Sequence, residues 1–229
     1  MGLLIAAFAE LKFFFIMFII IVVMASIMTR NSVKKVLFFA FGAVALILFS
    51  TLLSSLYDYF TDFMSFEKMW DMLFNPHYAS EEDIGRLSAI PVISERFLKT
   101  IPERLFGMGL GNADYSSVAI FNTDFFDTYR NTHYMLMMYS FLYIETGILG
   151  LILYVSFFII SLGVTLKIYK AKLADEAACQ LSIIFGVICY ILLIYNVELR
   201  KEIGYFAFFV LSLPFISMGV VKHKNELKD

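Results

Sequence analysis

The chain has 229 residues, of which 60 % are hydrophobic and 17 % are aromatic, a composition far from that of a soluble globular domain. The formal net charge of −2 provides no broad basic surface, so we expect no nucleic acid partner. Cys179 and Cys189 lie in one apolar segment and are separated by about 15 Å of helix, too far for a disulfide.

Five apolar stretches are long enough to cross a membrane, since about 20 apolar residues span the hydrocarbon layer. We expect spans at 3–28, 36–57, 146–166 (starting at 146 or earlier), 181–197 and 203–221. The fold class is therefore an all-α integral membrane protein with one long loop that contains short amphipathic helices. The chain divides into two spans in 1–57, a loop at 58–133, three spans in 134–221 and a tail at 222–229.

Orientation follows from lysine and arginine, which collect in short loops on the cytoplasmic side. They are frequent at 29–35, at 167–172 and in the tail, and all three agree if the N-terminus and the 58–133 loop lie outside. Because the N-terminus is expected outside and no leader precedes it, we expect this chain to be the C-terminal part of a longer protein. Insertion of the first span by its own hydrophobicity is the alternative. The connection at 198–202 conflicts with this orientation, because it also contains basic residues but would lie outside. Arg200 is therefore either an interfacial anchor or a functional residue.

The first part of the loop, 57–78, is aromatic and acidic with hydrophobic residues at helical spacing. Because tryptophan and tyrosine favour the membrane–water interface, we expect a helix that lies on the outer surface. His77 precedes a run of acidic residues at 81–83, for which a solvated loop is the expected interpretation and a metal site the alternative.

Apolar residues recur at three- and four-residue steps over 87–105, and Pro91 and Pro102 break this pattern into short helices. Arg96 and Arg104 fall among them. These cations would meet either ordinary lipid phosphates or the phosphates of a lipid that carries a diphosphate-linked sugar.

The segment LFGMGLGN at 105–112 contains Gly107, Gly109 and Gly111, without the strand and helix context of a dinucleotide fingerprint. Glycine permits both tight turns and close backbone approach to an anion. A simple turn and a phosphate cradle therefore both stay open.

Arg130 and His133 precede the third span. Histidine is the usual group for moving a proton near neutral pH, although it could instead cap the helix or sit at the interface. Glu145 lies inside the apolar stretch, where a carboxylate predicts a functional or paired role. In a continuous helix about 18 Å of rise would separate Glu145 from His133, so the two would form no dyad.

Together these motifs resemble the O-antigen ligase and polysaccharide polymerase family. The resemblance consists of AELK at 9–12, Gly85–Arg86, LFGMGLGN, the histidine and ETGILGL at 145–151. It covers about residues 9–160 and corresponds to the C-terminal half of such enzymes. It implies a multi-pass glycosyltransferase at the outer face of the bacterial cytoplasmic (inner) membrane, in O-antigen, capsule or exopolysaccharide biosynthesis.

The resemblance also implies the chemistry. Undecaprenyl-diphosphate-linked glycans would be donor and acceptor, with no cofactor and no metal. Arg86 would stabilise the departing diphosphate and His133 would act on the acceptor hydroxyl. A flippase or a chain-length regulator would be a partner, besides membrane lipids. The other expected substrate-binding residues are Lys12, Arg96, Arg104, Arg130, Arg200 and the three glycines, with Glu145 as a further candidate.

Three questions stay open at this point. Polymerase and ligase share these motifs and differ in the acceptor. A transporter fragment for lipid-linked glycans would carry ionisable residues and broken helices at mid-membrane. A non-catalytic multi-pass membrane protein would need neither Arg86 nor His133.

Overall fold

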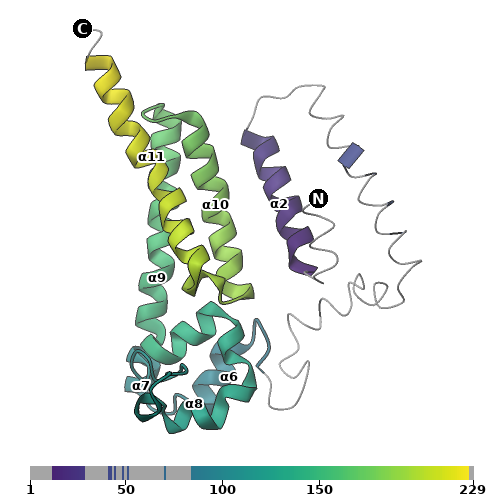
Figure 1. Ribbon diagram of the computed structural model, residues 1–229, viewed down its shortest axis with the longest axis vertical. Coiled ribbons are helices and arrows are strands. Elements are labelled where there is room, and N and C mark those ends of the chain that lie inside the picture. Colours follow the sequence, from purple (N-terminus) through teal and green to yellow (C-terminus); the bar gives the residue numbers. More distant parts are fainter. Residues whose placement is uncertain are drawn as a thin grey trace. The chain divides into compact units, whose positions relative to one another are not determined.

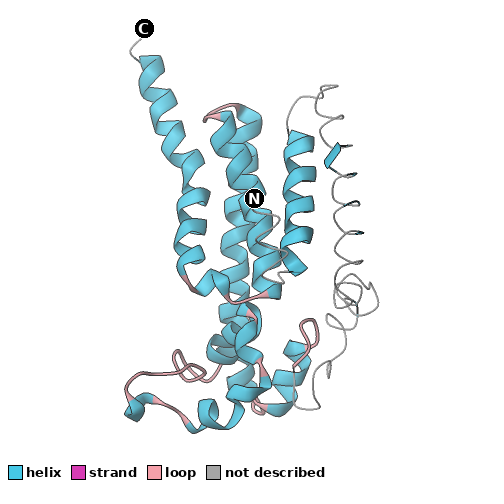
Figure 2. Ribbon diagram, turned by 45° about the vertical axis from the view of Figure 1, so that its right-hand side comes forward, coloured by secondary structure: helices cyan, strands magenta, loops and turns pink. Residues whose placement is uncertain are grey.

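A computed structural model of the chain describes residues 12–28, six single positions (41, 42, 44, 48, 51 and 70) and the continuous stretch 84–226 (Figure 1). Within these residues every regular element is a helix, and no strand occurs among them (Figure 2). The chain forms two units, Met1–Trp70 and Asp71–Asp229, and each is considered by itself.

The first unit contributes one described helix, α2 (Lys12–Met28), which lies within the first expected span. It is almost wholly apolar, as a lipid-facing helix should be. The expected second span, the aromatic segment 57–78 and His77 lie outside the described residues, apart from isolated positions. The side chain of Lys12 is likewise not described.

Three long helices dominate the second unit. They are α9 (Met138–Ala171), α10 (Glu176–Tyr195) and α11 (Glu202–Glu226), and they pack side by side (Figures 1 and 2). Each contains an apolar stretch long enough to cross a membrane. Large apolar side chains are exposed along them, among them Ile152, Leu153 and Phe209, as expected for contact with lipid. These helices are consistent with a helical membrane protein and overlap the third, fourth and fifth expected spans.

Helix α9 is broken at Gly147, whose φ of 65° and ψ of −169° are not helical. The whole helix has 34 residues and would be about 51 Å long, well beyond a hydrocarbon layer of about 30 Å. The part after the break, 148–171, is about 36 Å long and suffices to span. The break therefore separates a part long enough to span from a short N-terminal part, 138–146.

Residues 84–137 form a small helical region, here called the cap, at one end of α9, α10 and α11 (Figures 1 and 2). Its core is a cluster of rings from Phe97, Phe125, Tyr129 and Tyr134, with centroids 4.6–6.3 Å apart. The elements of the cap are α6 (Ala89–Arg96), α7 (Ile101–Phe106), η1 (Ala119–Phe121), α8 (Asp124–Tyr129), η2 (Arg130–Thr132) and η3 (Tyr134–Leu136).

The two prolines lie near the starts of α6 and α7 rather than interrupt them. Pro91 and Pro102 each lie in a first turn, where no intrahelical N–H donor is lost. The interruption lies at 97–100. There Thr100 starts α7 through a capping box with Glu103, and the hydrogen bonds from Thr100 lower the pKa of the Glu103 carboxyl.

Candidate functional site

The glycine segment packs directly on the break in α9. Gly107, Gly109 and Gly111 all have positive φ, at 74°, 99° and 83°. A Cβ on Gly107 would overlap the backbone of Glu145 and Thr146, and a Cβ on Gly147 would overlap the backbone of Leu105 and Phe106. The two glycines thus allow two backbones to touch, which a residue with a side chain would prevent.

The amides of this segment are used inside the chain. Gly107 N–H donates to the carbonyl of Glu103 at 2.7 Å, and Gly109 N–H donates to the carbonyl of Glu145 at 3.0 Å. Gly111 N–H donates to the Glu145 carboxylate at 2.9 Å. In this conformation the segment is a turn anchored on α9, and its three glycine amides do not point to a ligand.

Glu145 has the paired environment that a carboxylate in an apolar stretch requires. The residue is 6 % exposed. Its Oε1 accepts from Gly111 N–H at 2.9 Å and from Ala113 N–H at 3.4 Å. Glu145 therefore fixes the turn of the cap to the N-terminal part of α9.

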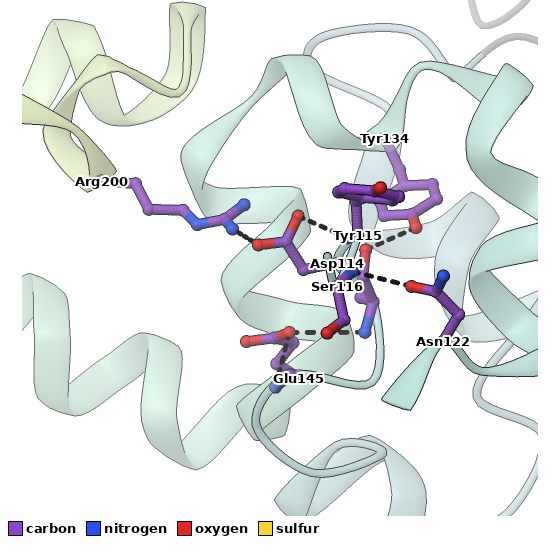
Figure 3. Close-up of polar contacts among 9 residues, drawn as sticks. Asp114, Tyr115, Ser116, Asn122, Tyr134, Glu145 and Arg200 are labelled. Carbon is purple, nitrogen blue, oxygen red and sulfur yellow. Dashed lines mark hydrogen bonds and ion pairs between the residues drawn. The ribbon is translucent and has the colours of Figure 1, made fainter. Parts of the chain in front are cut away.

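Arg200 joins the cap to the connection between α10 and α11. It ends η4 (Glu198–Arg200) and forms an ion pair with Asp114 of the cap (Figure 3). Its guanidinium carbon lies 3.9 Å from the centroid of the Phe141 ring, on α9. Burial lowers the pKa of Arg200 below its usual range. The side chain is thus held by a carboxylate and a ring.

Arg86 occupies a comparable position at the end of α10. Its Nη1 donates to the carbonyl oxygen of Tyr195, and the guanidinium carbon lies 4.3 Å from the centroid of the Tyr195 ring. The hydroxyl of Tyr139 on α9 donates to the carbonyl of Arg86. A cation at this point also complements the negative end of the α10 dipole.

His133 and Arg130 are exposed on the cap. His133 has left-handed backbone angles, φ 58° and ψ 13°, and separates η2 from η3. Helix α9 starts only at Met138, so no continuous helix connects His133 to Glu145, and the 18 Å separation expected for such a helix does not apply.

The two arginines of α6 and α7 differ in their surroundings. Arg104 donates from Nε to the carbonyl of Leu98 at 2.9 Å and from Nη2 to the carbonyl of Ser94 at 3.0 Å. It therefore ties α7 to the end of α6. Arg96 is exposed at the C-terminal end of α6.

Among the described residues, no group of three or more histidine, cysteine, aspartate or glutamate side chains could hold a metal ion. His77, with its neighbouring acids, lies outside them.

No family model, no curated protein and no solved structure matches this chain. Membership of the O-antigen ligase and polymerase family therefore stays a resemblance carried by the motifs named above.

Sequence reasoning missed the side chains that contact the guanidinium groups of Arg86 and Arg200, namely Asp114, Phe141 and Tyr195. Asp114 lies two residues after the glycine segment, which is the one local signal that could have drawn attention to it. The other two are aromatic residues within apolar stretches rich in such residues. Nothing in their local sequence distinguishes them from lipid-facing side chains.

Proposed function

We propose that this chain is part of a glycosyltransferase that acts on undecaprenyl-diphosphate-linked glycans at the outer face of the bacterial cytoplasmic membrane. The main support is the pair Arg86 and Arg200. Both guanidinium groups lie over aromatic rings at the cap end of three helices of membrane-spanning length. Arginine binds phosphate oxygens through a planar fork that stays charged, which suits a lipid diphosphate at the membrane surface.

The proposed reaction needs two kinds of group. Negative charge develops on the departing diphosphate, so cations must lie where that charge appears. Arg86 takes this role, and Arg200 assists it. The acceptor hydroxyl must lose a proton, and the exposed His133 serves as the base. The new glycosidic bond forms at the anomeric carbon as the bond to the diphosphate breaks.

One observation favours a second candidate, a non-catalytic membrane protein. Arg86 and Arg200 both have partners within the chain, namely the Tyr195 carbonyl and the Asp114 carboxylate. Arginines whose only task is to attach the cap would have the same contacts. The two candidates predict different results in a product assay with the wild-type protein, and removing the charge while the fold is kept tests the role of each arginine.

The transporter alternative has less support. The broken helix α9 and the nearby Glu145 are features of transporters. However, the break lies at the cap end of α9, and the Glu145 carboxylate is satisfied by amides of the cap. Neither feature provides an ion site within the spanning part of the helix.

The test is a product assay with the complete protein in vesicles, supplied with an undecaprenyl-diphosphate-linked oligosaccharide. We expect Arg86→Ala to abolish lengthened glycans while the amount of protein in the membrane is unchanged. Arg86→Lys should recover activity poorly, because lysine lacks the two-pronged fork. Lys99→Ala, which removes an exposed cation from the same cap, is the matched control and should behave as the wild type. Normal products from Arg86→Ala would restrict Arg86 to attaching the cap, whereas absence of product from the wild-type protein would favour the non-catalytic candidate.

The same assay examines His133. A general base contributes about 10² to 10⁴-fold in rate, so His133→Ala should lower turnover by that order. His133→Gln should fail similarly, because glutamine does not titrate. Recovery by glutamine would reduce His133 to a residue that orients the acceptor.

A further inference from the structure

Asp114 uses both of its carboxylate oxygens. Oδ1 accepts from the backbone N–H of Tyr115 at 2.8 Å, and Oδ2 forms the ion pair with Nη2 of Arg200 (Figure 3). One bond is local and the other joins the cap to the α10–α11 connection. The carboxylate is therefore oriented by its own backbone before it meets the arginine.

The backbone on the N-terminal side of Asp114 is held by three different elements. Ala113 is fully buried, its N–H donates to Glu145, and its carbonyl accepts from the Tyr134 hydroxyl at 2.6 Å. The carbonyl of Asn112 accepts from the Thr123 hydroxyl at 2.6 Å.

The C-terminal side is held as well, because Ser116 N–H donates to the Asn122 side chain at 2.7 Å. Asp114 thus projects toward Arg200 from a backbone fixed on both sides (Figure 3). A carboxylate on such a backbone can set the position of its partner to a fraction of an ångström.

On the other side of the pair, Arg200 retains further hydrogen-bonding capacity. A guanidinium has five N–H donors, and the ion pair engages Nη2. The ring of Phe141 fixes the plane of the group. The side chains of Arg200 and Asp114 are 31 % and 30 % exposed, so an anion can approach the pair. An ion pair with this exposure adds little stability, which favours orientation rather than attachment as its task.

We propose that Asp114 is a positioning residue for the reaction. This proposal rests on the proposed function. Its carboxylate holds the Arg200 guanidinium against Phe141, so that the other donors of the fork meet the diphosphate of the lipid-linked glycan. Asp114 touches no reacting atom itself and acts through Arg200.

The test uses Asp114→Asn in the complete protein. Asparagine keeps the shape and one acceptor but loses the charge that orients the guanidinium. A small misplacement of a group in contact with the transition state costs about 10²-fold. We expect turnover and turnover/KM to fall together by roughly 10- to 100-fold, with an unchanged melting temperature. Asp127→Asn, an exposed aspartate of the same cap, and Lys201→Gln, next to Arg200, are the matched controls and should be unaffected.

The charge swap Asp114→Arg with Arg200→Asp separates positioning from attachment. It restores an ion pair between the cap and the α10–α11 connection, but the cation then lies on the cap instead of on the connection. We expect the swap to recover the melting temperature relative to either single variant and to stay inactive. Recovered turnover in the swap, or wild-type turnover in Asp114→Asn, would overturn the proposal.

A readout independent of turnover is the rate at which phenylglyoxal modifies Arg200, followed by mass spectrometry of its peptide. We expect faster modification in Asp114→Asn than in the wild type, and protection of the wild type by undecaprenyl diphosphate. Equal rates with no protection would contradict the role of Asp114. Absence of any product from the wild-type protein would reject the proposed function, whereas product from the wild type with normal Asp114→Asn would reject only this inference.

Discussion

The cap is fastened to the long helices in two different ways. On α9 the contact is made by glycine backbones and by the Glu145 carboxylate, which is almost completely buried. At the α10–α11 connection the contact is an ion pair between Arg200 and Asp114, with each side chain about one-third exposed. The first contact has no room for another molecule, whereas the second consists of partly exposed charges. The first contact is therefore expected to decide stability, and the second to contribute little to it.

The largest effect is expected at the contact on α9. Gly107→Ala would force a Cβ into the backbone of Glu145 and Thr146 and would strain a φ of 74°. Strain alone costs about 1–3 kcal/mol, and the overlap with backbone adds to it. We expect little folded protein in the membrane and a large drop in melting temperature in detergent.

Two other glycines serve as controls for that variant. Gly111→Ala has the strain without the overlap, because nothing lies near its Cβ, and should be milder. Gly163→Ala, on the helical part of α9, has neither and should be neutral or stabilising by up to about 1 kcal/mol. An equal drop in melting temperature in all three variants would show that the overlap between the cap and α9 does not decide stability.

Removing the buried carboxylate should have an intermediate effect. Glu145→Ala leaves the N–H groups of Gly111 and Ala113 without their acceptor. The donor of the buried Ala113 costs about 1–3 kcal/mol when unsatisfied, whereas water can replace the carboxylate at the exposed Gly111. Glu145→Gln retains a carbonyl oxygen and should lose about half as much or less. Thermal unfolding of the two variants beside the wild type measures the difference. If glutamine and alanine were equally destabilising, the charge of Glu145 rather than its acceptor would be the important property.

The smallest effect is expected from Tyr134→Phe, which removes a single hydrogen bond to the Ala113 carbonyl and should cost about 0.5–1.5 kcal/mol. Burial raises the pKa of the Tyr134 phenol above its usual value, so the folded state favours the protonated form. This contribution is present below about pH 10 and is lost as the pH rises further. Unfolding curves between pH 8 and 11 should therefore converge for the wild type and Tyr134→Phe. A constant difference across that range would contradict this assignment.

The sequence predicted the long helices because membrane-spanning length and apolarity are properties of a local stretch. The third span was expected to start at 146 or earlier, and α9 begins at Met138. The break at Gly147 was not expected, because it depends on the contact with the glycine segment of the cap.

The site was predictable only in part. Burial of Glu145 in an apolar stretch indicated that it is paired, but its partners lie more than thirty residues earlier in the chain. Asp114 and Arg200 are farther apart still, and a pairing over that distance leaves no periodic signal. Arg200 was singled out because its charge conflicts with the expected orientation, and it does have a specific partner.

The central claim is that the complete protein transfers a glycan from its lipid diphosphate carrier. The most direct measurement is the release of undecaprenyl diphosphate from a labelled donor in vesicles, with a metal chelator present and no nucleotide sugar added. The account predicts release in step with lengthening of the acceptor glycan, and its loss in Arg86→Ala. A donor that stays intact, whether it remains in place or crosses the membrane, would contradict it.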